Sequence, residues 1–71
     1  MSFDIRARFG ARVRQLRKRR GWTQAEMADR LGIDRSYLAD IERGKRNVSL
    51  LNIEIIADGF GLTISKLLSR I

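Results

Sequence analysis

Apolar residues recur at helical spacing near the start of the chain. The stripe consists of Ile5, Phe9, Val13 and Leu16. Its spacing is that of an amphipathic α-helix with one face turned to a core. Ser2 or Asp4 can supply the N-cap, and Gly21 stands where a helix-ending glycine is expected. The pattern predicts a helix at about 4–20.

Two shorter helical patterns follow, at 24–31 and 35–43. Thr23 and Asp34 precede them, and the side-chain oxygen of either residue can accept a backbone N–H as an N-cap. Only Gly32 and Ile33 separate the first pattern from the second cap. Two capped helices joined by a tight glycine-bearing turn predict a helix-turn-helix, a unit that reads DNA.

Two further apolar patterns predict helices at about 49–59 and 63–69. Ser49 can cap the first of these, and Thr63 starts the second. The residues expected to point inward from the first are Leu50, Ile53, Ile56, Ala57 and Phe60. The sequence therefore predicts an all-α fold in one domain, 1–71, built as a compact five-helix bundle with a central helix-turn-helix.

The charge is strongly positive and unevenly placed. Fifteen Lys and Arg against eight Asp and Glu give a net charge of +7, and residues 1–20 contain only one acid, Asp4. A strongly basic small domain is typical of a nucleic-acid binder. The run Arg17-Lys18-Arg19-Arg20 has a simpler alternative, a solvated face that complements the helix dipole. Membrane binding is disfavoured because the core needs the apolar stripe of this helix.

Other chemistry is scarce. The sequence has no cysteine and no histidine, and its acids are scattered or assigned to caps and pairs, so we expect no enzyme, cofactor, metal site or disulfide. It has neither a membrane-spanning apolar run nor a signal-peptide pattern. We therefore expect a cytoplasmic, nucleoid-associated protein without a membrane or small-molecule partner.

Residues 12–68 resemble the Cro/phage-repressor (XRE-type) helix-turn-helix family. The resemblance rests on GWTQ, on an Ala-x-x-Leu-Gly turn and on Ser-Tyr-Leu-x-x-Ile-Glu-Arg-Gly-Lys-Arg-Asn. Within the family, the stretch DRSYLADIERGKRN looks most like controller proteins of restriction–modification systems. The resemblance implies that the helix at 35–43 enters the major groove. It also implies a structural ion pair between Arg17 and Glu42.

Four residues are candidates for reading bases: Arg35, Ser36, Tyr37 and Arg46. Arg35 is the strongest, because its guanidinium fork matches O6 and N7 of guanine. Ser36 discriminates weakly. Tyr37 can offer its hydroxyl or ring, and its burial against the 24–31 helix is an equal alternative. Arg46 can reach a base edge or a narrow minor groove.

Asp40 is an acid on the side expected to face DNA. It can accept a hydrogen bond from cytosine N4 or orient Arg35 or Arg43, and we favour the second role.

The candidate phosphate contacts are Gln24, Arg43, Lys45, Asn47 and Ser49. Gln24 and Ser49 stand at helix starts, where backbone N–H groups favour anions. Gln24 can equally be an ordinary solvent-facing residue. The other three lie at or after the end of the predicted recognition helix. Phosphate contacts set register and affinity without carrying sequence information.

A dimer surface is predicted on the last two helices. Its candidate members are Leu51, Ile55, Ile64, Leu68 and Ile71. An exposed apolar patch usually marks a partner site, although a slightly larger core is the simpler alternative. One domain reads few base pairs, and a symmetric dimer doubles the site.

The predicted function is that of a homodimeric transcription regulator on a pseudo-palindromic operator in double-stranded DNA, acting as a repressor or an activator. Control of restriction–modification genes fits the narrower resemblance. No sequence remains for a ligand-sensing domain, so regulation would depend on protein concentration. The alternative is an antitoxin that masks a toxin and autoregulates its operon.

Overall fold

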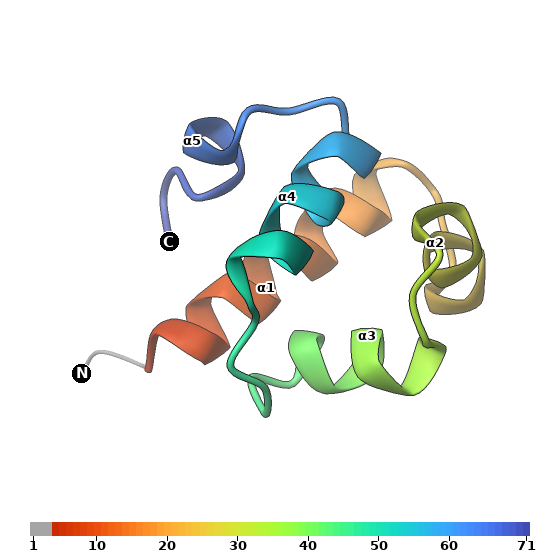
Figure 1. The fold of residues 1–71 in the computed structure, drawn as a ribbon, viewed down its shortest axis with the longest axis horizontal. Helices are drawn as coiled ribbons and strands as arrows, with labels where there is room; N and C mark the ends of the chain where they lie inside the picture. The colour runs from red at the N-terminus through yellow and green to blue at the C-terminus, as the bar shows by residue number, and fades with distance from the viewer. Residues whose placement is uncertain (1–3) are drawn as a thin grey trace.

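Five helices make up the part of the chain that the structure describes. The computed structural model describes residues 4–71 and contains α1 (Ile5–Arg19), α2 (Gln24–Leu31), α3 (Arg35–Glu42), α4 (Leu50–Gly59) and α5 (Ile64–Leu67). No strand occurs among these described residues. Helix α1 packs on α3, α2 packs on α3 and α4, and α5 packs on α4. In Figure 1, α3 lies at the far side of the molecule from α5. The predicted all-α, five-helix fold is confirmed.

Side chains cap the N-termini of the helices by accepting backbone N–H groups. The carboxylate of Asp4 accepts the N–H of Arg6 at 2.7 Å, and that of Asp34 accepts the N–H of Ser36 at 2.7 Å. Thr23 forms a capping box with Glu26, in which each side chain accepts the other residue's backbone N–H. These bonds satisfy N–H groups that have no partner within the helix. Ser2, the alternative cap of α1, lies outside the described residues.

Helix α5 is shorter than the predicted span 63–69. It ends at Leu67, and Arg70 adopts a positive φ of 67° shortly afterwards. The guanidinium of Arg12 in α1 holds this end of the helix, because its Nε donates to the carbonyl of Leu67 at 3.0 Å and its Nη2 donates to that of Lys66 at 2.9 Å. A four-residue helix is therefore fixed by a distant side chain as well as by its cap.

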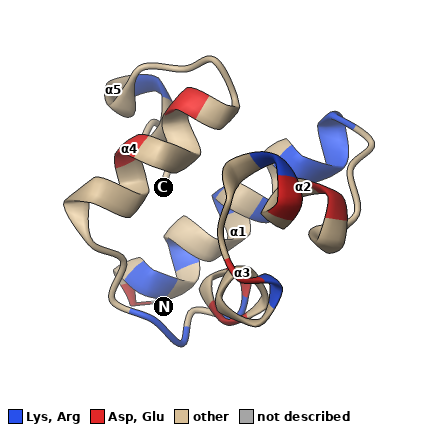
Figure 2. Cartoon of the chain, turned by 45° about the vertical axis from the view of Figure 1, so that its right-hand side comes forward, with Lys and Arg blue, Asp and Glu red and all other residues tan. Residues whose placement is uncertain are grey.

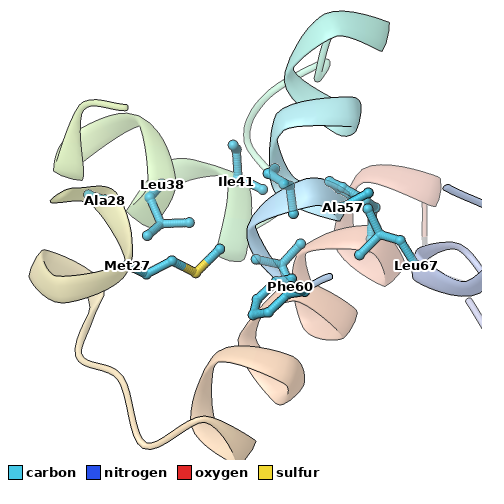
Figure 3. Close-up of a cluster of buried hydrophobic side chains, with 10 residues drawn as sticks. Met27, Ala28, Leu38, Ile41, Ala57, Phe60 and Leu67 are labelled. Carbon is cyan, nitrogen blue, oxygen red and sulfur yellow. The ribbon is translucent and has the colours of Figure 1, made fainter. Parts of the chain in front are cut away.

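The core collects apolar side chains from all five helices and from Phe60. Its largest fully buried members are Phe60, Met27, Leu38, Ile41, Ile56, Leu67 and Val13. Figure 3 shows side chains from α2, α3 and the end of α4 converging on this cluster. The prediction that Leu50 points inward is wrong, because its side chain is 81% exposed. Ile56 and Ala57 are buried, and Ile53 packs partly buried against them.

Gly10 sets how closely α1 approaches α3. A Cβ at this position would collide with the backbone carbonyl of Ile41 and would lie 2.9 Å from that of Glu42. Glycine inside a helix lowers its stability by about 1 kcal/mol relative to Ala. At this position, however, the absence of a Cβ lets the backbones of α1 and α3 come into contact.

Arg17 and Glu42 form the ion pair that the family resemblance implies. Nε and Nη2 of Arg17 donate to the Glu42 carboxylate at 2.7 and 2.9 Å, and Nη1 donates to the carbonyl of Trp22 at 2.8 Å. The Glu42 side chain is only 3% exposed. The hydrogen bond to Glu42 raises the pKa of Arg17 above its ordinary value. This pair joins α1 to the end of α3 and fixes the orientation of α3.

Candidate nucleic-acid interface

The first turn of α3 presents two exposed polar side chains, Arg35 and Ser36. Asp34 caps this turn and accepts the backbone N–H groups of Ser36 and Tyr37 at 2.7 and 3.2 Å. The cap holds the backbone of the turn, while Arg35 and Ser36 project into solvent. Side chains at this end of a recognition helix are those that reach base edges.

Tyr37 is half-buried, and its environment differs from the prediction. Its hydroxyl accepts a hydrogen bond from Nδ2 of Asn52 in α4 at 2.9 Å. The guanidinium of Arg46 lies 5.4 Å from the centre of the Tyr37 ring, within cation–π range. Tyr37 therefore connects α3 to α4 and to the loop after α3. Asn52, which the sequence reasoning missed, could have been noticed as an amide within an apolar run.

Asp40 holds two arginines. Its Oδ1 accepts a hydrogen bond from Nη2 of Arg43 at 2.6 Å, and its Oδ2 accepts one from Nε of Arg46 at 3.2 Å. These hydrogen bonds, first that of Arg43 and then that of Arg46, hold the pKa of Asp40 below its ordinary value. The expectation that Asp40 orients Arg43 agrees with this geometry. Its hold on Arg46 was not foreseen.

Gln24 is half-buried at the start of α2, where its Nε2 donates to the carboxylate of Glu42 at 3.2 Å. This contact fixes the amide beside the buried Arg17–Glu42 pair. The simple solvent-facing alternative therefore does not describe Gln24.

The loop between α3 and α4 is basic and exposed. Lys45, Arg46 and Asn47 are all exposed, and Figure 2 shows Lys and Arg positions in this loop beside α3. Ser49 closes the loop as the N-cap of α4, where its hydroxyl accepts the N–H of Asn52 at 3.1 Å. Base-edge candidates and phosphate candidates thus lie on adjacent segments.

The predicted dimer residues fall into two groups. Leu51 is 65% exposed, and Ile64 is also exposed. Ile55, Leu68 and Ile71 are half-buried. Leu68 and Ile71 line an apolar hollow of about 270 Å³ with Ile5, Phe9, Val48 and Ile53. Two of the five predicted residues are therefore exposed and three are half-buried, and whether they form an interface stays a prediction. Leu50, which was expected to point inward, adds an exposed apolar side chain on α4.

Two further features bear on the chemistry of the described residues 4–71. None of their helices has the length and hydropathy needed to cross a bilayer. Nor do they contain a cluster of three or more His, Cys, Asp or Glu side chains able to hold a metal ion.

Comparison with known proteins identifies the family. A helix-turn-helix family model matches residues 13–67. The control protein C.MunI of a Mycoplasma species is 46% identical over 69 residues, which cover 96% of this chain and 93% of that protein. The crystal structure of the restriction–modification controller protein C.AhdI from Aeromonas hydrophila matches with a TM-score of 0.86 and 40% identity, covering 92% of this chain and 98% of that one.

A DNA-bound relative has the same fold. The controller protein C.Esp1396I, solved as a tetramer with its natural 35 base-pair operator, matches with a TM-score of 0.82 and 27% identity, covering 94% of this chain and 87% of that one. The family model spans α2 and α3 together with most of the remaining chain. The chain therefore belongs to the helix-turn-helix family of XRE-type DNA-binding regulators.

Proposed function

We propose that this protein is a sequence-specific transcription regulator of the controller type, which binds a pseudo-palindromic operator as a homodimer and acts on restriction–modification genes. The observation that carries the proposal is the capped start of α3, where Arg35 and Ser36 are exposed beside a basic loop. The likeness to C.MunI and C.AhdI supports the controller role. As a regulator of this family, the protein would work in the cytoplasm, on the nucleoid.

Two classes of DNA contact divide the interface. Arg35, Ser36, Tyr37 and Arg46 are proposed to read bases, with Arg35 as the main reader because a guanidinium forms two hydrogen bonds to guanine. The contacts proposed for phosphate are Gln24, Arg43, Lys45, Asn47 and Ser49. Exposed cations beside the recognition helix supply affinity without sequence information.

A dimer would recognise a longer operator than one protomer, because each protomer would read one half-site. Leu51, which is 65% exposed, and Ile64 are the best-placed members of the proposed interface. Ile55, Leu68 and Ile71 would contribute their exposed parts. Two copies related by a two-fold axis would place two α3 helices in successive major grooves, about 34 Å apart.

The antitoxin alternative has no specific support among the relatives described above. C.MunI and C.AhdI are controller proteins, and the relative solved with DNA is one as well. A partner that co-purified with the protein would be needed to revive this alternative.

Selection of bound duplexes from random DNA tests the function. We expect an enriched site with two-fold symmetry, which the protein shifts in an electrophoretic mobility assay. Arg35→Ala should cost about 1–3 kcal/mol on this site and relax the preference at one base pair in each half-site. Lys45→Ala is the matched control, since it should weaken binding to every sequence. It should also reduce the slope of log affinity against log salt concentration by about one. Equal losses for Arg35→Ala on the selected and scrambled sites would contradict the base-reading role.

A further inference from the structure

The α3 helix and its cap contain three acids, of which two serve the fold. Asp34 caps the helix, and Glu42 is buried in its pair with Arg17. Asp40 does neither, because within residues 4–71 its carboxylate binds only Arg43, the C-cap of α3, and Arg46 of the following loop. Its side chain is 23% exposed, and both arginines remain at least half exposed. The acid therefore stands at the surface proposed to face DNA.

A carboxylate in this position opposes DNA binding in two ways. It repels phosphates, and it competes with them for the guanidinium groups of Arg43 and Arg46. A phosphate oxygen that used the same N–H group would have to break or share a hydrogen bond of 2.6 or 3.2 Å, and one that used another N–H group would still meet a cation partly neutralised by the carboxylate. Affinity for a generic DNA backbone would be higher without Asp40.

The same carboxylate also orients Arg46. Its hydrogen bond to Nε keeps the guanidinium over the ring of Tyr37, at 5.4 Å from the ring centre. Asn52 holds the hydroxyl of that tyrosine at 2.9 Å. Arg46 is thereby kept beside the recognition helix, which is the orientation that a base-reading arginine needs.

We propose that Asp40 is a specificity-determining residue, which restrains Arg43 and Arg46 so that binding to arbitrary DNA is weakened while Arg46 stays oriented for the operator. The inference rests on the proposed function, because it concerns the difference in affinity between operator and other DNA. Specificity is this difference in affinity, and it increases when binding to DNA other than the operator becomes less favourable.

The expected size follows from phosphate electrostatics. Each phosphate neutralised on duplex DNA contributes about 0.9 to the slope of log affinity against log salt. Removing one negative charge per protomer and releasing two guanidinium groups should steepen the slope on scrambled DNA by about one unit per protomer. At about 0.1 M salt, this corresponds to a gain in affinity for scrambled DNA of roughly five- to tenfold for each protomer that contacts the duplex. On the operator, the same gain is offset by the lost orientation of Arg46.

The test measures the dissociation constants of Asp40→Asn on two duplexes of equal length and composition. One carries the site selected by the unmodified protein and the other carries a scrambled site, and both are titrated between about 0.05 and 0.3 M NaCl, a range over which phosphate contacts change affinity strongly. Asp40→Glu retains the carboxylate and should keep the original selectivity. Asp29→Asn is the charge control, because Asp29 is exposed on α2 and forms no ion pair among residues 4–71.

We expect Asp40→Asn to bind scrambled DNA at least threefold more tightly than the unmodified protein does, with a steeper slope of log affinity against log salt. The ratio of its dissociation constant on scrambled DNA to that on the operator should fall at least threefold. Asp29→Asn should show less than half of either change. Circular dichroism would establish that each variant is folded, and Asp40→Ala provides a second variant without the carboxylate.

Three results would overturn the proposal. Unchanged affinity for scrambled DNA would show that Asp40 restrains nothing. An equal gain on both duplexes would show a charge effect without specificity. An altered preference at one base pair alone would instead identify Asp40 as a base reader. Failure of the unmodified protein to prefer its selected site would contradict the proposed function itself, and this result is separate from the response of Asp40→Asn on scrambled DNA.

Discussion

Glu42→Gln should destabilise the fold severely, although it changes few atoms. The carboxylate accepts two hydrogen bonds from Arg17, at 2.7 and 2.9 Å, and a third from Gln24 at 3.2 Å. A glutamine amide has only one oxygen, so its NH₂ group would face a guanidinium N–H or the amide of Gln24. The side chain of Arg17 is 10% exposed, so water cannot readily replace the lost acceptor.

The magnitude follows from the burial of this pair. Removing one partner of a buried ion pair costs about 3 kcal/mol or more, because the other charge stays buried without compensation. A chain of 71 residues is expected to have a free energy of unfolding of about 4–10 kcal/mol. The substitution should therefore remove a third or more of the stability and lower the Tm by roughly 12–24 °C.

Urea unfolding followed by circular dichroism measures this loss, at one fixed protein concentration because the proposed dimer would contribute to stability. Arg17→Met should cost a similar amount. The double variant Arg17→Met/Glu42→Gln leaves no unpaired charge, so its loss should be smaller than the sum of the single losses by about 2 kcal/mol. A loss below about 1 kcal/mol for Glu42→Gln, or strict additivity in the double variant, would refute the role assigned to this pair.

Three further predictions concern other parts of the fold. Gly10→Ala should lose about 2 kcal/mol or more in urea unfolding, because the new Cβ meets the Ile41 carbonyl, whereas an unobstructed helix site would gain about 1 kcal/mol. The backbone N–H of Thr23 lowers the pKa of Glu26, so this stabilisation is present above the unfolded-state value of 4.5 and is lost as pH falls through the lower folded value. The Tm difference between the unmodified protein and Glu26→Ala should then shrink from pH 7 to pH 3, and a constant difference would contradict this. Leu51, which is 65% exposed in the protomer, belongs to the proposed interface, where a two-fold dimer would bury it twice. Leu51→Asp should therefore weaken the proposed dimer at least about 100-fold in sedimentation experiments without unfolding the chain, whereas an intact dimer would place the interface elsewhere.

Local rules were sufficient to predict the helices and their caps. Thr23, Asp34 and Ser49 act within three residues of their own position, so their roles can be read from neighbouring sequence. The ion pair of Arg17 and Glu42 lies beyond such rules, because 25 residues separate the partners. Only the resemblance to a known family implied it.

The wrong prediction for Leu50 arose because the apolar residues of α4 do not single out one face of the helix. The run Leu50-Leu51-Asn52-Ile53 continues into Ile55 and Ile56, so several helix faces are apolar and periodicity alone cannot choose one. Packing buries Ile56 and leaves Leu50 exposed. The bond from Asn52 to Tyr37 and the hold of Asp40 on Arg46 depend on how segments meet in space, which no local pattern encodes.

If α3 and the adjoining loop recognise a specific operator, as proposed, the protein must distinguish that operator from other DNA. The most direct measurement compares the affinity of the unmodified protein for its selected site with that for a scrambled duplex, at one salt concentration near 0.15 M. We expect a two-fold symmetric site that is bound at least 1000-fold more tightly than the scrambled duplex, a difference of about 4 kcal/mol, and we expect Arg35→Ala to remove a large part of this preference. Equal affinity for the two duplexes would contradict it, because a basic surface alone binds every sequence alike.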